Sequence, residues 1–336
     1  MSNAKIKTYP SDFFVTEILV PQFSEPDGEH LWCYIEKSGM NTHFVKRRWS
    51  ELTGCPLKDI SHSGLKDRHA VTRQWLCLPA KYASILPNQE QKQDEYWKIL
   101  EQHRQRKKLR VGTHRQNRFS IIIREINSDS IEIEKLLEQI REQGFPNAFG
   151  PQRFGHNNLN HAMKWVEKKR LPKKADERGR VISALRSAAF NAQLEARIAE
   201  QNWQIPLEGD CMVLSGSNSH FFIEQVNEEI TKRVCSGDIS PAGWLPGKGE
   251  YLDVGVAAQI RYKALSPYQE VIEYLKQYTE TAWRAFCVIP QAMEWQWLED
   301  STLALSFILP RGSYATALLA ELMEITDVSN IQYSSD

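Results

Sequence analysis

The pattern of apolar residues changes twice along the 336-residue chain, and this change constrains the fold more than any other feature of the sequence. As far as Gly144, alternating segments typical of β-strands are mixed with helical ones. Between Gly144 and Val288 helical segments dominate, and after residue 300 the earlier style returns. A strand and a helix near the end can complete the first sheet. The sequence therefore predicts a mixed α+β domain around a sheet, interrupted by an inserted smaller α/β domain.

Four segments before Gly144 alternate between apolar and polar residues, which predicts strands at 13–20, 31–36, 71–78 and 119–126. The polar turn 24–29 lies between the first two strands, and this arrangement favours a hairpin. We expect Asn41 to cap a helix over 44–52, and a second helix over 130–142. The polar segment 89–94 is interpreted as a mobile surface loop.

After Gly144 the helical pattern predicts helices at 160–169, 180–201, 268–285 and 314–325. Strands are expected at 211–214 and 303–308. Glycine and proline residues in 240–249 and 310–313 indicate turns.

Composition places the chain among soluble globular proteins, because 41% of residues are hydrophobic, 25% are charged, and no run of eighteen apolar residues exists. The polar amino-terminal segment predicts no signal peptide and a cytoplasmic location. The six cysteines are well separated, which fits neither a disulfide framework nor a zinc site, so no metal is expected. We also expect a monomer, because no long apolar helix face lacks a place in the core.

Charge is balanced overall, with 42 basic and 42 acidic side chains, but it is uneven along the chain. Seven Lys or Arg residues and no carboxylate lie between Arg104 and Arg118, and eight basic residues lie between Lys164 and Arg180. Such stretches either neutralise nucleic-acid phosphates or simply form a solvated face, and charge alone leaves both interpretations open.

The segment from Gly64 to Trp75 places a carboxylate, Asp67, between two cations and after a glycine. Positive charge from Lys66 and Arg68 favours the ionised form of Asp67. By itself this triplet is equally typical of a turn cap or a surface ion pair. The segment reads Gly64-Leu65-Lys66-Asp67-Arg68-His69-Ala70-Val71-Thr72-Arg73-Gln74-Trp75.

This order of residues resembles the signature Gly-x-Lys-Asp-x-x-Ala-x-Thr-x-Gln of the tRNA pseudouridine synthase D (TruD) family at every fixed position. Four further segments resemble family motifs in the right order. They are Pro10-Ser11-Asp12-Phe13-Phe14-Val15-Thr16-Glu17, Asn117-Arg118-Phe119, the stretch 146–155 and the stretch 309–316. The likeness extends from Pro10 to about Ile325.

The resemblance implies a pseudouridine synthase catalytic domain around an antiparallel sheet, over 1–143 and 289–336, and an inserted TRUD domain over 144–288. It implies an isomerase, an intramolecular transferase, that converts uridine 13 of a tRNA to pseudouridine without a cofactor. The family's nucleophile falls on Asp67. Which atom the carboxylate attacks, C1′ or C6, or whether it acts as a base at C2′, stays open. The expected partner is a tRNA substrate, and no association with a membrane is expected.

The resemblance also implies substrate contacts for four residues, Phe13, Asn117, Phe119 and Tyr314. An aromatic face stacks on uracil, and an asparagine amide matches its donor and acceptor edge. The three aromatics are equally suited to ordinary core packing.

Supporting roles are expected for Lys66, Glu17 and Arg153, with Glu17 paired to Lys66 or Arg153 so that it orients the active-site segment. Two other functions are compatible with the residues alone. One is an RNA-binding protein without turnover, and the other is a hydrolase that uses Asp67 and Glu17 as paired carboxylates. Flanking basic stretches favour RNA over a saccharide.

Overall fold

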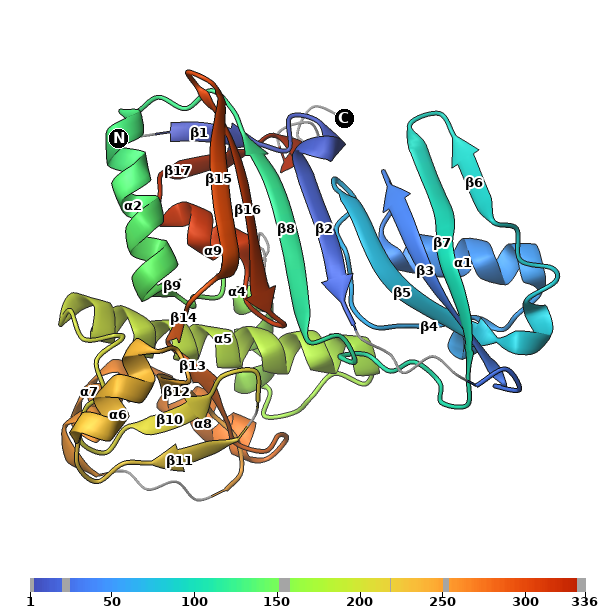
Figure 1. Ribbon diagram of the computed structural model, residues 1–336. Helices are drawn as coiled ribbons and strands as arrows, with labels where there is room; N and C mark the ends of the chain where they lie inside the picture. The colour runs from blue at the N-terminus through green and yellow to red at the C-terminus, as the bar shows by residue number, and fades with distance from the viewer. Residues whose placement is uncertain (1–2, 20–24, 151–157, 218, 250–253, 331–336) are drawn as a thin grey trace. The chain divides into compact units, whose positions relative to one another are not determined.

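A computed structural model describes residues 3–19, 25–150, 158–217, 219–249 and 254–330 (Figure 1). Contacts within the chain define two compact units. Unit 1 contains Met1–Lys135, Pro290–Gly312 and Leu322–Asp336, and unit 2 contains Leu136–Ile289 and Ser313–Glu321. The fold is mixed α+β, as the sequence predicts. The predicted domain boundaries at 143 and 289 stay a prediction. The division by contacts differs from them because it groups 136–143 and Ser313–Glu321 with unit 2.

Unit 1 is built on a nine-stranded sheet whose strands pair antiparallel except for β2 and β5. Across the sheet the order is β15 (Gln291–Glu299), β16 (Thr302–Pro310), β8 (Gln116–Ile123), β2 (Phe13–Ile18), β5 (Val71–Pro79), β3 (His30–Ser38), β7 (Glu95–Gln105) and β6 (Gln89–Lys92), with β4 (Ser61–His62) against β5. The expected strand near the end of the chain, observed as β16, pairs with β8 and so completes the sheet.

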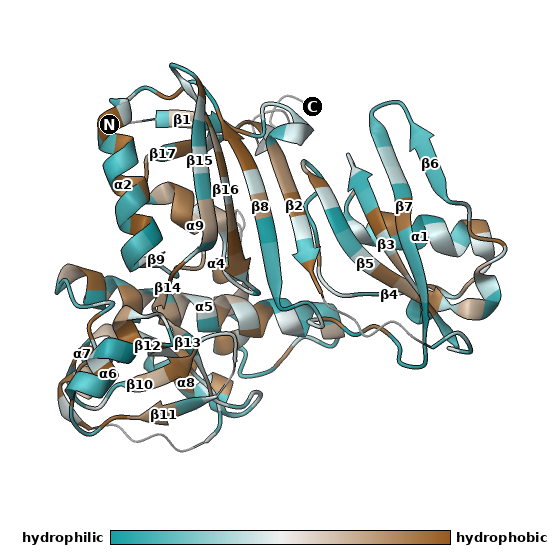
Figure 2. Ribbon diagram, viewed as in Figure 1, coloured by the Kyte–Doolittle hydropathy of each residue, from teal (hydrophilic) through white to brown (hydrophobic). Residues whose placement is uncertain are grey.

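The predicted hairpin between the first two strands is wrong. β2 pairs with β5 and β8, and β3 pairs with β5 and β7. β5 lies between them because most of its residues are buried, on both faces of the sheet, which is typical of a central strand. The predicted loop at 89–94 is also wrong, since β6 and β7 form a hairpin there. β6 is polar along its whole length (Figure 2), so it shows no apolar alternation.

Helix α1 (Thr42–Thr53) covers one face of the β3, β5 and β7 part of the sheet. It begins as predicted, because the Asn41 side chain accepts a hydrogen bond from the amide of Phe44. It ends at Gly54, whose φ of 71° is the left-handed conformation that glycine adopts freely. Its buried residues Val45 and Trp49 pack into the core of this region.

The ends of the described chain meet in a second, two-stranded sheet of unit 1. There β1 (Asn3–Ile6) pairs in parallel with β17 (Glu324–Asp327). The helix predicted at 314–325 is therefore wrong in its second half, since only α9 (Ala315–Ala320) is helical. This pairing brings Lys7 within 2.8 Å of Asp327.

Unit 2 combines helices with a four-stranded antiparallel sheet of order β11, β10, β12 and β13. Its strands are β10 (Cys211–Leu214), β11 (His220–Phe222), β12 (Ile239–Leu245) and β13 (Ala282–Ala285), with β9 (Phe145–Pro146) paired to β14 (Cys287–Val288). Its helices are α4 (Asn158–Glu167), α5 (Ala175–Ala199), α6 (Glu228–Cys235), α7 (Gly255–Leu265) and α8 (Gln269–Lys276). Helix α2 (Ser130–Gln143) spans the boundary of the two units.

Three sequence predictions in unit 2 need correction. The turns expected at 240–249 contain β12, where Pro241 is tolerated although a proline usually indicates a turn. The helix expected at 268–285 ends after α8 and is followed by β13. Helix α7 was not predicted, because its apolar residues are not confined to one face. Among the described residues, no helix combines the length and apolarity needed to span a bilayer.

Candidate active site

The candidate site lies in unit 1 on the segment between β4 and β5, which contains the motif around Asp67. Gly64 opens this segment and is held by Gln74, whose amide donates to the Gly64 carbonyl at 3.1 Å. A Cβ atom at Gly64 would lie 2.7 Å from Glu17 Oε1 and 2.7 Å from His114 Cε1. The motif glycine is therefore explained by close packing, since a side chain there would collide with two buried groups.

Asp67 presents an accessible carboxylate, with 56% of its side chain exposed. The nearest cation is Lys7, whose buried Nζ lies 3.8 Å from Asp67 Oδ2 and also pairs with Asp327. Below the segment, the buried Lys37 donates from Nζ to the main-chain oxygen of Asp67 at 2.7 Å. Neither lysine belongs to a motif of the sequence.

The two cations next to Asp67 in the sequence direct their side chains to other partners. Lys66 turns inward and donates to Glu17 Oε1 at 2.9 Å and to Asn117 Oδ1 at 3.1 Å. Arg68 extends the other way and contacts the Gly39 carbonyl at 2.7 Å and Glu95 at 2.8 Å. Positive charge does lie beside Asp67, but it comes from distant parts of the chain.

Glu17 forms the predicted ion pair with Lys66, and its side chain is fully buried. Its second oxygen accepts the main-chain N–H of Trp75 at 3.0 Å. Burial raises the pKa of Glu17, although the attraction of Lys66 and the Trp75 hydrogen bond act in the opposite direction. Its two oxygens are therefore both engaged beneath the segment that carries Asp67.

His114 completes this buried network, and no sequence motif indicated it. Its Nδ1 lies 2.7 Å from Ser63 Oγ and 3.9 Å from Glu17 Oε1. Burial, aided by the charge of Lys66, lowers the pKa of His114 to about 4, so the imidazole is neutral at neutral pH. Lys66 is therefore the cation that compensates Glu17.

Three of the predicted substrate residues lie together on β2 and β8. Asn117 is opposite Glu17 in the pairing of the two strands, and its carbonyl oxygen is held by Lys66. The rings of Phe13 and Phe119 meet edge to face with centroids 6.2 Å apart. Lys7 Nζ lies 5.0 Å from the centre of the Phe13 ring, so one lysine contacts both Phe13 and Asp67.

The two remaining predicted site residues do not belong to the described part of unit 1. Tyr314 belongs to unit 2, where its ring centroid is 6.1 Å from that of Phe149. Arg153 lies outside the described residues. Their predicted roles stay predictions.

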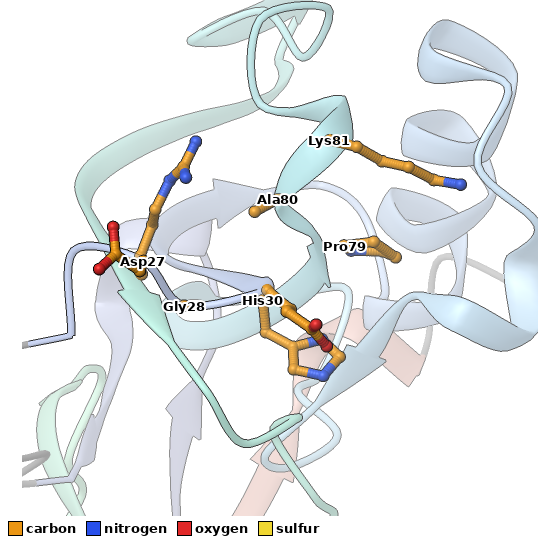
Figure 3. A pocket seen from close by; sticks show the side chains of 8 residues that line it. Asp27, Gly28, His30, Pro79, Ala80 and Lys81 are labelled. Atoms are coloured by element: carbon orange, nitrogen blue, oxygen red, sulfur yellow. The ribbon is translucent and has the colours of Figure 1, made fainter.

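A cavity of about 500 Å³ lies at the opposite ends of β3 and β5 from Asp67 and is lined by Gly28, His30, Pro79 and Lys81 among others (Figure 3). Acidic and basic residues are mixed in its wall, and none of the motif residues contributes to it. We therefore do not assign the reaction to this cavity.

The basic stretch between Arg104 and Arg118 connects β7 to β8 and leads directly into Asn117. Six of its seven cations are exposed, and Lys108 is half-buried. The basic stretch of unit 2, from Lys164 to Arg180, is exposed at all eight cations. These side chains are free to meet a polyanion.

Comparison with known proteins identifies the class. A solved structure described as a tRNA pseudouridine synthase D from Methanosarcina mazei matches with a TM-score of 0.66 and 22% identity, over 96% of this chain and 93% of that one. The chain thus shares the fold of that structure. A family model described as tRNA pseudouridine synthase D (TruD) matches residues 2–166 and 180–322.

Curated relatives agree with the family model. The tRNA pseudouridine synthase D of Legionella pneumophila (strain Lens) is 38% identical, with 96% of each chain covered. That of Proteus mirabilis (strain HI4320) is 37% identical, over 97% of this chain and 94% of the relative. The chain belongs to the tRNA pseudouridine synthase D (TruD) family, and its enzyme class is that of the isomerases that form pseudouridine.

Proposed function

We propose that the protein isomerises the uridine at position 13 of a tRNA to pseudouridine, with Asp67 as the nucleophile. The observation that supports this most strongly is a contrast in exposure within the motif network. The side chains of Glu17 and Lys66 are 0% and 7% exposed, whereas that of Asp67 is 56% exposed. Asp67 therefore offers the accessible carboxylate of a network that is otherwise buried.

The chemistry requires one carboxylate and no electron transfer. The bond between N1 and C1′ breaks, a bond between C5 and C1′ forms, C5 loses a proton and N1 gains one, so substrate and product are isomers. An accessible carboxylate beside the sugar and base serves this reaction. A hydrolase with paired carboxylates needs a second acid at the sugar. Burial of Glu17, with both oxygens engaged, argues against that alternative.

Asn117 is suited to read the base. Lys66 occupies one lone pair of its amide oxygen and fixes which atom is oxygen, so the amide N–H groups are left to donate to a uracil carbonyl. Phe13 and Phe119 are 4% and 8% exposed, so they are better placed to form the wall behind a base than to stack over its full face. Tyr314 is proposed to supply a further aromatic contact.

The two basic stretches are proposed to bind the tRNA backbone. Each cation that neutralises a phosphate releases counterions, so affinity should fall steeply with salt, by about one power of salt concentration per contact. Arg104 to Arg118 lies beside Asn117 in sequence, and we assign it to phosphates near the target uridine, which must leave its stack to reach Asp67. We assign Lys164 to Arg180 to another part of the same tRNA.

The proposal is tested with two unmodified tRNA transcripts that differ at one base, uridine or cytidine at position 13. The wild-type protein is incubated with each without any added cofactor, and pseudouridine is mapped at every position. We expect product at position 13 of the first transcript and none in the second. Product at another position would keep the reaction and overturn the position. Tight binding with no product from any tRNA would favour RNA binding without catalysis.

A further inference from the structure

A fully buried lysine lies directly beneath the candidate nucleophile. Lys37 is 0% exposed at the end of β3, on the same face of the strand as Leu31, Cys33 and Ile35, which are also buried. An apolar side chain would suit this place, because removing an ammonium group from water costs several kcal/mol. Fold stability alone therefore does not explain a lysine at this position.

The hydrogen bonding of Lys37 points at one residue. Among the described residues, the only hydrogen bond of its side chain is the one of 2.7 Å to the main-chain oxygen of Asp67. Its partners in strand pairing, Thr72 on β5 and Trp97 on β7, carry no charge. The charged groups that influence it are Asp67, which favours its ammonium form, and Lys66, which opposes it.

Asp67 needs an anchor of this kind. It lies in the irregular segment before β5, and its side chain is mostly exposed, so side-chain packing does little to fix it. Lys66 on one side is anchored through its N–H to Thr42 Oγ1 at 2.9 Å, and Arg68 on the other side through Gly39. The Lys37 contact is the one that holds the main chain of Asp67 itself.

We propose that Lys37 is a positioning residue, which clamps the main chain of Asp67 and so holds its carboxylate at a constant distance from the reacting sugar. This inference rests on the proposed function of Asp67. A displacement of a reacting group by about 1 Å can lower a rate by roughly 100-fold. A buried amine whose one side-chain hydrogen bond goes to the main chain of the nucleophile is suited to prevent such a displacement.

Lys37→Met tests the proposal, because methionine fills similar space and cannot donate. We expect the single-turnover rate to fall by roughly 100-fold. The Kd for tRNA should stay within about 2-fold, and the melting temperature should be equal or higher, since a buried charge has been replaced by an apolar group. Lys98→Met is the matched control. Lys98 pairs with Glu36, the neighbour of Lys37, and does not touch Asp67, so its rate should be that of the wild type.

Lys37→Arg separates positioning from space filling. Arginine keeps a charge and a donor but is larger, so we expect the order of rates to be Lys, Arg, Met and the order of stability to be Met, Lys, Arg. Three results would each overturn the proposal. They are an order of rates that equals the order of stabilities, a wild-type rate for Lys37→Met, and failure of Lys37→Met to fold. Asp67→Asn is assayed in parallel. If it keeps its rate, the proposed function fails; if it is inactive while Lys37→Met is fully active, only the role of Lys37 fails.

Discussion

Glu17→Gln should destabilise unit 1 although it replaces one planar side chain by another of the same size. Both oxygens of Glu17 act as acceptors, one for Lys66 Nζ at 2.9 Å and one for the Trp75 N–H at 3.0 Å. A glutamine has one oxygen, so in either orientation its amide group faces a donor. The buried Lys66 also loses its counter-ion. Breaking a buried ion pair from one side costs about 3–5 kcal/mol.

The loss is measured by chemical and thermal unfolding of the wild type and Glu17→Gln, with about 2–4 °C in Tm expected per kcal/mol for a domain of this size. Glu273→Gln is the control, because Glu273 forms an exposed pair with Lys276 and its substitution should change stability by no more than about 0.5 kcal/mol. A double-mutant cycle that adds Lys66→Met and the double variant isolates the interaction energy between Glu17 and Lys66. The free energy of unfolding lost in the double variant should be smaller than the sum of the losses in the two single variants, by about 0.5–3 kcal/mol.

Two results would refute this reasoning. A change for Glu17→Gln no larger than that of the control, within about 0.5 kcal/mol, would mean that the pair does not contribute as its burial indicates. Strict additivity in the cycle would mean that Glu17 and Lys66 do not interact energetically.

Two further stability predictions follow from the same region. Gly64→Ala should destabilise the protein by about 1–3 kcal/mol, because the added methyl group collides with Glu17 and His114. The control is Gly179→Ala in helix α5, where no atom lies near the Cβ position, and it should stabilise the protein by about 0.5–1 kcal/mol. Equal effects of the two substitutions in urea unfolding would contradict the packing explanation. Burial lowers the pKa of Lys37 to about 7 from its ordinary 10.5, so above pH 7 the unfolded chain binds more protons there than the folded one. The contribution of Lys37 to the free energy of unfolding should therefore rise with pH over this range, by up to about 1.4 kcal/mol per unit, and parallel pH curves for wild type and Lys37→Met would contradict it.

Sequence patterns predicted the elements whose causes are local. The start of α1 depends on Asn41 and the amide of Phe44, three residues away. The strand observed as β16 shows its own alternation, and its membership of the first sheet was predicted from the return of the strand pattern after residue 300, whereas its pairing with β8 came from the structure. Of the two partners expected for Glu17, Lys66 or Arg153, the structure shows the pair with Lys66.

The failures concern contacts between distant segments. Lys7, which lies 3.8 Å from Asp67, meets Asp327 because β1 pairs with β17, and no pattern near Lys7 predicts a strand partner more than three hundred residues away. The hairpin of β2 and β3 was wrong because β5 lies between them, a placement decided by burial on both faces of that strand.

Lys37 was missed although the sequence contains a signal for it. Leu31, Cys33 and Ile35 alternate along one face of β3, and Lys37 is the next residue of that face. A charge that continues a buried apolar face is costly, and it indicates a partner that the sequence does not identify. The structure supplies that partner, which is the carbonyl of Asp67.

The most direct test of the central claim compares wild type with Asp67→Asn in pseudouridine mapping and tRNA binding on the same preparation of unmodified tRNA. The substitution keeps the shape of the side chain and removes its negative charge, and Lys37 still holds the main chain. We predict an unchanged Kd for tRNA and no detectable pseudouridine from Asp67→Asn, against full conversion by the wild type. Pseudouridine formed by Asp67→Asn at the wild-type rate would contradict the assignment of Asp67 as the nucleophile.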